Sequence, residues 1–517
     1  MTLKYKFTPK KYQFKVLALT LDNLLCMTSV GLLQKLMRQT AVYGLSSIVA
    51  RLLNYLLVPL YTRLLSPDEY GIVTEMYSYV AFLIVLYTYG METAFFNTLR
   101  SEEENKYTIY STSFWSLLLS TVVFSTILCV LSQPIAELLH YPQQAHFVRY
   151  IALILALDTL ATLPFAWLRY EEKALRFAII RLITIGANIG LNIFFLVLCP
   201  KYADSVAWIK AIYSPQMGVG YIFLSNLISS ALCLLLLLPE LLAVRWEWNK
   251  ALWRTMVWYG LPLVVVGLAG SINEVLDRLL LKHLLPYDTA RNLAELGIYG
   301  ACYKLSILMT LFTQAYRFAV EPLFFKEAGQ KDSPNFYANT TRYYIAVTWF
   351  IFLGVLLFLP ILQHFIGRDF RSGLSVVPIL LAANLFLGLY YNLSIWYKLS
   401  NKTHLGAIIS LIGSLLTIVL NVWWIPIWGY LGSAYATLIC YSSMCIISYF
   451  WGQKHYPIPY PIPLLLLYTL TALVLWQIDS RLFIASAVGQ YGFKIFLLSA
   501  YIGIIVYLEK RQAFSKQ

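Results

Sequence analysis

The chain alternates between long apolar segments and short polar ones. Fourteen segments are long and apolar enough to cross a membrane as helices, because a span needs about 20 mostly apolar residues. They cover residues 39–62, 71–97, 110–133, 149–168, 177–199, 219–243, 255–281, 296–325, 343–365, 374–397, 405–425, 432–451, 462–478 and 491–508. Each is too long for a barrel strand, so the pattern predicts an all-α polytopic membrane protein with about 14 transmembrane helices.

The composition agrees with a lipid environment and excludes several other classes. Hydrophobic residues make up 59% of the 517 residues and charged residues 12%, about half the ~25% typical of soluble domains. Disorder is excluded because it requires low hydrophobicity. The connecting loops leave no room for a soluble catalytic domain, and the sequence has no Walker A, HExxH or GxSxG motif. We therefore expect a protein that is not an enzyme and uses no cofactor.

The net charge of +14 reflects topology. With the N-terminus placed in the cytoplasm, 24 of the 39 Lys and Arg residues fall on the cytoplasmic side, 9 on the other side and six within spans. Since Lys and Arg favour cytoplasmic loops, this asymmetry predicts an even number of spans with both termini cytoplasmic. It also accounts for the basic character without nucleic acid as a partner.

An internal repeat divides most of the chain into two halves. Residues 38–45 (RQTAVYGL) match 254–261 (RTMVWYGL), and Glu69, Gly71, Ile72 and Tyr77 pair with Glu295, Gly297, Ile298 and Tyr303. Six spans per repeat give both halves the same orientation. This pattern predicts two parallel six-helix lobes related by a pseudo-twofold axis along the membrane normal, plus two C-terminal helices, which is a standard transporter layout.

The repeat sets the predicted domain boundaries. Residues 1–36 form a basic cytoplasmic N-terminal extension, 37–250 the N-lobe, 251–453 the C-lobe, and 454–517 the last two spans and a cytoplasmic tail. The seven Cys and six His residues show no metal-ligand spacing, so we expect neither a metal site nor a disulfide framework.

Two longer strings carry a resemblance to a known family. The string from Tyr61 to Gly71 (YTRLLSPDEYG) resembles the signature between the first two helices of bacterial polysaccharide-biosynthesis membrane proteins. The string from Asn421 to Thr437 (NVWWIPIWGYLGSAYAT) looks like the pattern that joins helices 11 and 12 of that family. The pair Asp277-Arg278 and the Gly297-Ile-Tyr299 string also resemble it. The resemblance covers about residues 37–451 well.

The resemblance implies a fold and a function. The family belongs to the multidrug/oligosaccharidyl-lipid/polysaccharide exporter superfamily and includes Wzx-like flippases of O-antigen and lipopolysaccharide biosynthesis. It implies a flippase in the bacterial inner membrane that moves an undecaprenyl-pyrophosphate-type lipid-linked oligosaccharide to the periplasmic leaflet. Membrane lipids, a polysaccharide polymerase and coupling H⁺ or Na⁺ are the implied partners. A lipid II flippase and a cation-coupled multidrug exporter are the alternatives.

Ionisable residues inside spans are the candidate site, because each costs roughly 2.5–3.5 kcal/mol at the bilayer centre and such groups usually face the bundle interior. Arg51 lies mid-span, where the family resemblance places a cavity-lining basic residue. It is expected to bind the pyrophosphate through its guanidinium fork. The alternative is an interhelical ion pair, for example with Asp158.

Spans 5 and 8 supply further candidates. Arg181 shares a helix face with Asn188 and Asn192, which suits phosphate followed by sugar hydroxyls, although Arg181 could equally extend to the surface. In span 8 the candidates for substrate binding or gating are Lys304, Gln314, Arg317 and Glu321. An i,i+4 pair between Arg317 and Glu321 is the structural alternative.

The remaining candidates are for coupling or gating. Span 7 ends with Glu274, Asp277 and Arg278, which either bind a coupling cation or form a structural pair near the rim. Pro59 is expected to kink the first span, as a hinge or as a fixed bend.

Two further expectations concern side chains at or near the membrane surface. The aromatic clusters that include Tyr390, Tyr391, Trp396 and Tyr397 suit either sugar stacking or packing. Lys494 is expected to extend to the membrane surface.

Overall fold

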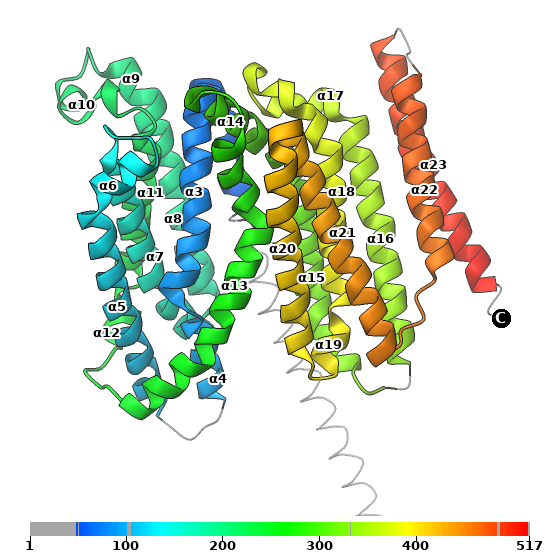
Figure 1. Ribbon diagram of the computed structural model, residues 1–517, viewed down its shortest axis with the longest axis horizontal. Coiled ribbons are helices and arrows are strands. Elements are labelled where there is room, and N and C mark those ends of the chain that lie inside the picture. Colours follow the sequence, from blue (N-terminus) through cyan, green and yellow to red (C-terminus); the bar gives the residue numbers. More distant parts are fainter. Residues whose placement is uncertain (1–47, 50, 101–104, 331, 483–485, 515–517) are drawn as a thin grey trace, which may run out of the picture.

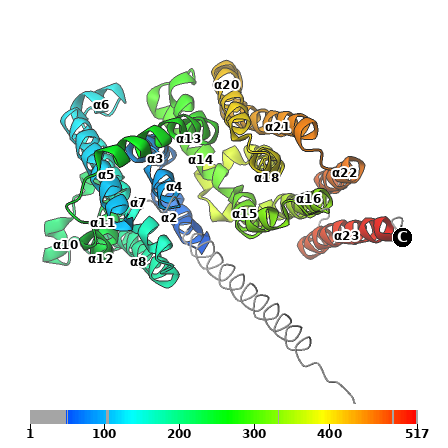
Figure 2. The ribbon, with the colours of Figure 1, turned by 90° about the horizontal axis from the view of Figure 1, so that it is seen from below.

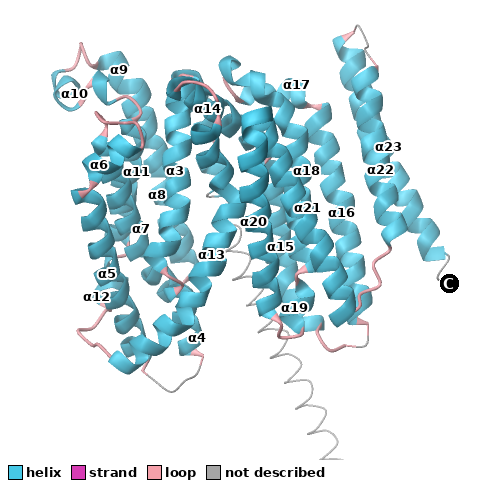
Figure 3. Cartoon of the chain, viewed as in Figure 1, coloured by secondary structure: helices cyan, strands magenta, loops and turns pink. Residues whose placement is uncertain are grey.

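The structure is a computed structural model and describes residues 48–514 apart from 50, 101–104, 331 and 483–485. All regular structure in these residues is helical (Figure 3). Eleven helical segments are long and apolar enough to cross a membrane, and a bent helix pair forms a twelfth. The all-α membrane fold is therefore confirmed. Residues 39–47 and 50 of the first predicted span, 39–62, and all of the extension 1–36 lie outside the described residues.

The helices gather into two bundles (Figures 1 and 2). The N-terminal bundle has six longer elements, namely α3 (Pro67–Thr88) with α4 (Met91–Leu99), α5 (Lys106–Val130), α7 (Ala145–Tyr170), α8 (Ala174–Ile193) and α11 (Gly220–Leu236). The short helix α2 (Leu57–Leu64) precedes α3. Further short helices cap this bundle: α6 (Ser132–Leu138), α9 (Cys199–Tyr202), α10 (Ala207–Ile212) and α12 (Leu238–Leu242).

The C-terminal bundle begins with the longest described helix. Its elements are α13 (Lys250–Leu284), α14 (Thr289–Leu305) with α15 (Ile307–Glu327), α16 (Ser333–Leu357), α18 (Val377–Leu393) with α19 (Ile395–Leu399), α20 (Thr403–Trp428) and α21 (Tyr430–His455). The short helix α17 (Leu359–Leu362) and a 3-10 segment (Arg368–Val376) connect α16 to α18. Two last helices, α22 (Ile462–Arg481) and α23 (Ala487–Phe514), lie beside α16 (Figure 2).

The segment predicted as one span over 296–325 is broken. Helix α14 ends at Leu305 and α15 begins at Ile307, and the two are bent by 48°. The side chain of Ser306, at the break, donates a hydrogen bond to the backbone of Tyr303 at 2.7 Å and accepts one from Asn384 at 3.1 Å. A polar residue at this position satisfies backbone and side-chain groups that the interrupted helix leaves open.

The string after Tyr61 forms a helix start. Ser66 is the N-cap of α3, Pro67 is its first residue, and the Glu69 carboxylate accepts from the Ser66 backbone N–H at 2.9 Å. This capping box satisfies N–H groups that have no partner within the helix, and proline suits the first helical turn. The family-like signature therefore fixes where α3 begins.

Helices α3 and α14 cross at two glycines of the repeat. A Cβ atom on Gly71 would lie 2.0 Å from the backbone oxygen of Leu293, and one on Gly297 would lie 1.9 Å from that of Pro67. Only glycine permits so close an approach of two backbones. The crossing joins the two bundles at one end of the molecule, named here the closed end, and the bundles diverge toward the other end, named the open end (Figure 1).

Helix α13 belongs to both bundles. Near the open end, Trp253 donates a hydrogen bond to Ser116 of α5 at 2.8 Å, and a Cβ on Gly260 would lie 2.5 Å from the backbone oxygen of Tyr89. At the middle of α13, Ala269 accepts a hydrogen bond from Ser414 of α20 at 3.0 Å. Figure 1 shows the helix passing from one bundle to the other.

Buried polar contacts attach the last two helices to α16. Glu509 of α23 accepts from Arg342 at 3.0 Å and from Tyr468 of α22 at 2.5 Å. Lys494 is buried, donates to the backbone oxygen of Leu357 at 2.6 Å and pairs with Asp479 at 3.5 Å. The expectation that Lys494 extends to the membrane surface was therefore wrong, because a carboxylate and a carbonyl of the protein satisfy its ammonium group.

Candidate functional site

A buried ion pair closes the junction between the bundles. The Lys282 ammonium on α13 contacts both carboxylate oxygens of Glu75 on α3 at 2.9 Å, and the two side chains are 1% and 0% exposed. Tyr141, in the loop before α7, donates to Glu75 at 2.5 Å, and its ring lies 4.1 Å from Lys282. We name Glu75, Tyr141 and Lys282 the latch.

The latch is fully hydrogen-bonded. Lys282 also donates to the backbone oxygen of Leu139 at 2.6 Å. Burial, and then the adjacent Glu75 charge, raises the pKa of Tyr141, so its phenol keeps the proton that it donates. A buried charge pair with all its groups satisfied specifies one arrangement of the elements that carry it. It therefore holds the two bundles together at the closed end.

A second group of charges lies on the faces of α13 and α14 between the latch and the open end. The Arg278 guanidinium stacks on the Tyr303 ring at 4.4 Å. The Lys304 ammonium lies 5.7 Å from the ring of Tyr55, and the charges of Arg278 and Glu274 both act on it. We name Arg278 and Lys304 the upper cations.

Asp277 lies in the contact between α13 and α14. It is buried, and its carboxylate accepts from the Tyr299 hydroxyl at 2.6 Å and from the Arg278 backbone N–H at 2.8 Å. Both partners are protein groups in the Asp277-Arg278 and Gly297-Ile-Tyr299 strings that resemble the known family. These strings therefore meet in space and pin α13 to α14.

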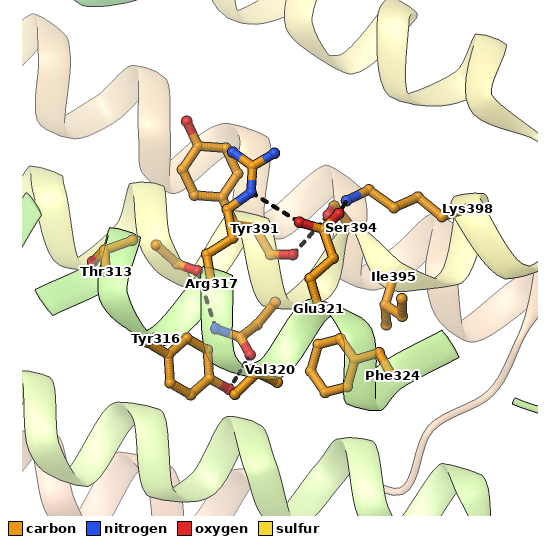
Figure 4. A pocket seen from close by; sticks show the side chains of 12 residues that line it. Thr313, Tyr316, Arg317, Val320, Glu321, Phe324, Tyr391, Ser394, Ile395 and Lys398 are labelled. Carbon is orange, nitrogen blue, oxygen red and sulfur yellow. Dashed lines mark hydrogen bonds and ion pairs between the residues drawn. The ribbon is translucent and has the colours of Figure 1, made fainter. Parts of the chain in front are cut away.

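A third group of charges, nearer the open end, joins α15 to α19 (Figure 4). Glu321 accepts from Arg317 at 3.3 Å, as the i,i+4 spacing predicts, and from Lys398 at 2.5 Å. We name Arg317, Glu321 and Lys398 the basic triad, since it carries two cations and one anion. The Arg317 guanidinium stacks on the Tyr391 ring at 4.9 Å, and its side chain is 49% exposed.

Arg51 belongs to this same region. Its side chain is exposed, and its charge acts on Tyr391, the ring on which Arg317 stacks. Asp158, the ion-pair partner considered for Arg51, accepts a hydrogen bond from Ser230 at 2.7 Å and feels the charge of Arg181. The structure therefore groups Arg51 with Arg317, and Asp158 with Arg181.

Arg181 and Asn188 lie on α8 of the N-terminal bundle. The Arg181 guanidinium lies over the Phe165 ring at 4.0 Å and is exposed. Asn188 is half-buried and accepts through its side-chain and backbone oxygens from Asn192, at 3.0 and 2.8 Å. Asn192 in turn accepts from Tyr61 of α2 at 2.9 Å, which fixes α2 against α8.

The other predicted positions have simpler surroundings. Gln314 is half-buried on α15, one turn before Arg317. Pro59 lies in α2. A turn at Leu56, three residues before Pro59, separates α2 from the helix that precedes it. A proline cannot donate to the carbonyl four residues before it, so an interruption at this place is expected.

The aromatic clusters contain both packing residues and half-buried residues that line a cavity. Trp396 is 1% exposed, stacks on His455 at 5.4 Å and donates to Ser448 at 3.2 Å, so it is a packing residue. Tyr391 and Tyr397, by contrast, line a cavity of about 700 Å³ together with Arg317, Lys398 and His404. Lys398 and the latch residue Lys282 were not among the predicted site residues.

These features define a polytopic membrane transporter: two helical bundles joined at one end, with charged side chains left within the spans. Its fold resembles a solved structure of the lipid II flippase MurJ in an inward closed conformation, with a TM-score of 0.68, 15% identity, and coverage of 89% of this chain and 98% of that one. It also resembles an inward-facing multidrug resistance MATE family transporter, with a TM-score of 0.62, 14% identity, and coverage of 80% and 94%.

The sequence comparison places the chain in a family. The model of the polysaccharide biosynthesis protein family matches residues 60–367, and the chain belongs to this family. A curated relative, the succinoglycan biosynthesis transport protein ExoT of Rhizobium meliloti, is 31% identical over 106 residues, which are 20% of this chain and 21% of ExoT. The aligned segment thus spans about a fifth of that relative. The resemblance stated from the sequence motifs is confirmed.

Proposed function

We propose that this protein is a flippase that moves a polyprenyl-pyrophosphate-linked oligosaccharide across the bacterial inner membrane, from the cytoplasmic to the periplasmic leaflet. The observation that carries the proposal is the series of cations on the diverging faces of the bundles. Arg51, Arg317 and Lys398 lie nearer the open end, and the upper cations lie nearer the closed end. A pyrophosphate is the anion that such a series suits, because Arg and Lys form charge-assisted bonds to its oxygens.

The shape of the molecule suits alternating access. In the orientation predicted from the Lys and Arg distribution, the open end faces the cytoplasm and the latch closes the periplasmic side. The headgroup enters from the cytoplasm, and its charge is offset by Arg51, Arg181 and Arg317. The bundles then rock, the latch opens and the upper cations hold the headgroup before its release. Asp158, Glu274, Asp277 and Glu321 are the carboxylates available to a coupling H⁺ or Na⁺.

The two alternatives make different demands on the site. The first alternative is a cation-coupled multidrug exporter; the MATE structure that this fold resembles is named as a multidrug resistance transporter. Such an exporter takes mostly cationic compounds and needs an acidic or apolar cavity. The arginines and lysines of this cavity disfavour it. A lipid II flippase would carry the same pyrophosphate, so the discriminating feature is the glycan. The family to which the chain belongs favours a surface polysaccharide intermediate, handed to a polymerase after transport.

The proposal is tested by reconstitution. Full-length protein in liposomes is given a defined polyprenyl-pyrophosphate oligosaccharide, and its movement is followed with and without H⁺ and Na⁺ gradients. Wild-type protein is expected to flip it, and Arg51→Ala to abolish flipping while still inserting in the membrane. Lys210→Ala, on the exposed helix α10, is the matched control. Normal flipping by Arg51→Ala, or efflux of a cationic drug in place of the glycan lipid, contradicts the proposal.

A further inference from the structure

Helices α13 and α20 pack together only over part of their length. Toward the closed end, Asn273 of α13 donates to the backbone oxygen of Ser410 at 3.2 Å, and Ser414 donates to Ala269 at 3.0 Å. Toward the open end, α13 leaves α20 for the N-terminal bundle, where its Gly260 lies against Tyr89. Between these two contacts lies Pro262, which removes one backbone hydrogen bond from α13.

A slot lies where the two helices part. It has a volume of about 700 Å³ and lies between α13, the α18–α19 segment and α20. The wall on α13 is apolar and consists of Pro262, Leu263, Val265 and Val266. Val265 is 52% exposed and, on the facing helix, Leu411 is 45% exposed. Apolar side chains are therefore left uncovered on both sides of the slot at the depth of Leu411.

The opposite wall is polar and basic. It carries Arg317 and Lys398 of the basic triad, His404, and the hydroxyl-bearing side chains of Tyr391 and Tyr397. Glu321, which pairs with both triad cations, does not line the slot, and the triad carries two cations and one anion, so its net charge beside the slot is positive. One wall thus suits an apolar chain and the other suits an anionic headgroup.

The depth of the slot fits the same amphiphile. Its lining on α20 runs from Thr403, the first residue of that span, to Leu411. Eight residues of α-helix correspond to about 12 Å. The slot therefore reaches from the membrane surface into the hydrocarbon layer. A soluble sugar phosphate would leave the apolar wall in contact with water, and a neutral lipid would leave the net positive charge of the basic triad unbalanced.

We propose that the slot between α13 and α20 is the lateral entry port for the isoprenoid pyrophosphate lipid that carries the cargo. Arg317 and Lys398 receive the pyrophosphate at the open end, and the first isoprene units lie along Val265 and Leu411. The tail stays in the bilayer while the headgroup passes between the bundles. This proposal rests on the proposed function for the identity of the lipid, and it adds the route.

Photolabelling tests the route separately from transport. Full-length protein in liposomes is exposed to an isoprenyl pyrophosphate with a diazirine in its first isoprene unit, and labelled peptides are identified by mass spectrometry. Label is expected in the peptides around Val265 and Leu411, competed by unlabelled isoprenyl pyrophosphate and not by anionic phospholipid. Label elsewhere, or equal competition by phospholipid, overturns the port.

Plugging the slot supplies the second measurement. Val265→Trp and Leu411→Trp are expected to reduce both labelling and flipping at least tenfold. The controls are Leu261→Trp and Ile408→Trp, at exposed positions (46% and 41%) on the same helices outside the slot lining. Flipping that survives both plugs overturns the port and leaves the proposed function standing. Specific labelling without any flipping supports the port and contradicts the proposed function.

Discussion

Lys282 of α13 holds both carboxylate oxygens of Glu75 of α3, each at 2.9 Å, in a site that excludes solvent. The two residues are 207 positions apart in the chain and belong to different halves of the predicted repeat. The contact exists only while the bundles meet at the closed end. Opening that end must separate two buried charges or move them into water.

The latch is expected to respond differently to single and double substitution. Lys282→Met leaves Glu75 buried without its cation and should cost about 3–5 kcal/mol of stability, whereas Lys282→Met with Glu75→Leu should recover most of it. Thermal unfolding in detergent measures both. Equal losses in the single and double variants would mean that packing, rather than the charge pair, stabilises the closed end.

Alanine substitutions at two glycines, one at the crossing of α3 and α14 and one away from it, are expected to differ in their effect on stability. Gly297→Ala places a Cβ 1.9 Å from the Pro67 oxygen and should lower the melting temperature and abolish export. At Gly186 of α8 a Cβ meets nothing within 4 Å. Gly186→Ala should therefore be neutral or stabilise by about 0.5–1 kcal/mol, as expected for alanine in a helix. The same direction of change in both variants would refute the close crossing.

The basic triad should affect substrate affinity more than stability. Glu321 is 33% exposed, and a partly exposed pair contributes roughly 0–1 kcal/mol. Glu321→Gln should leave the melting temperature nearly unchanged and tighten the binding of isoprenyl pyrophosphate, because it frees two cations. Lys398→Ala should weaken that binding. Titration at low and high salt measures both, and an unchanged affinity in Glu321→Gln would contradict the assigned role.

The last two helices should depend on their buried polar contacts. Glu509→Ala leaves Arg342 and Tyr468 without the carboxylate that joins α23 to α16 and α22. When a protease site is placed in the 456–461 linker and cut, the α22–α23 fragment should copurify with the rest of the wild-type protein and be lost from Glu509→Ala. Gln477→Ala, on α22 at an exposed position, is the control. Retention of the fragment in both variants would show that apolar packing suffices.

Local and periodic signals in the sequence located much of this architecture. The apolar segments correspond to helices, Ser66 and Pro67 start α3 as their capping chemistry requires, and the Arg317–Glu321 pair follows from i,i+4 spacing. The repeat pointed to Gly71 and Gly297, which lie in contact in the structure. Each of these inferences needed only neighbouring residues or a recurring string.

The partners that sequence reasoning missed are distant in the chain. Lys398 approaches Glu321 from another helix, and Lys282 lies just beyond its predicted span, where a lysine is typical of a membrane surface. Pairing it with Glu75 requires knowing that α3 and α13 meet. The available signal was an acidic residue near the start of span 2 and a basic residue at the end of span 7, on the same predicted side.

Helix α13 carries Lys282 near one end and the apolar wall of the slot around Val265, so the latch and the entry port share one rigid element. A displacement of this helix that releases Glu75 also changes the width of the slot. Lipid binding and latch closure are then thermodynamically linked. If the lipid binds the slot only while the latch is closed, it stabilises the closed latch, and breaking the latch weakens lipid binding by the same factor. Helix α13 thereby sets the order of events in transport, because the closed end opens only after the cargo has left the port.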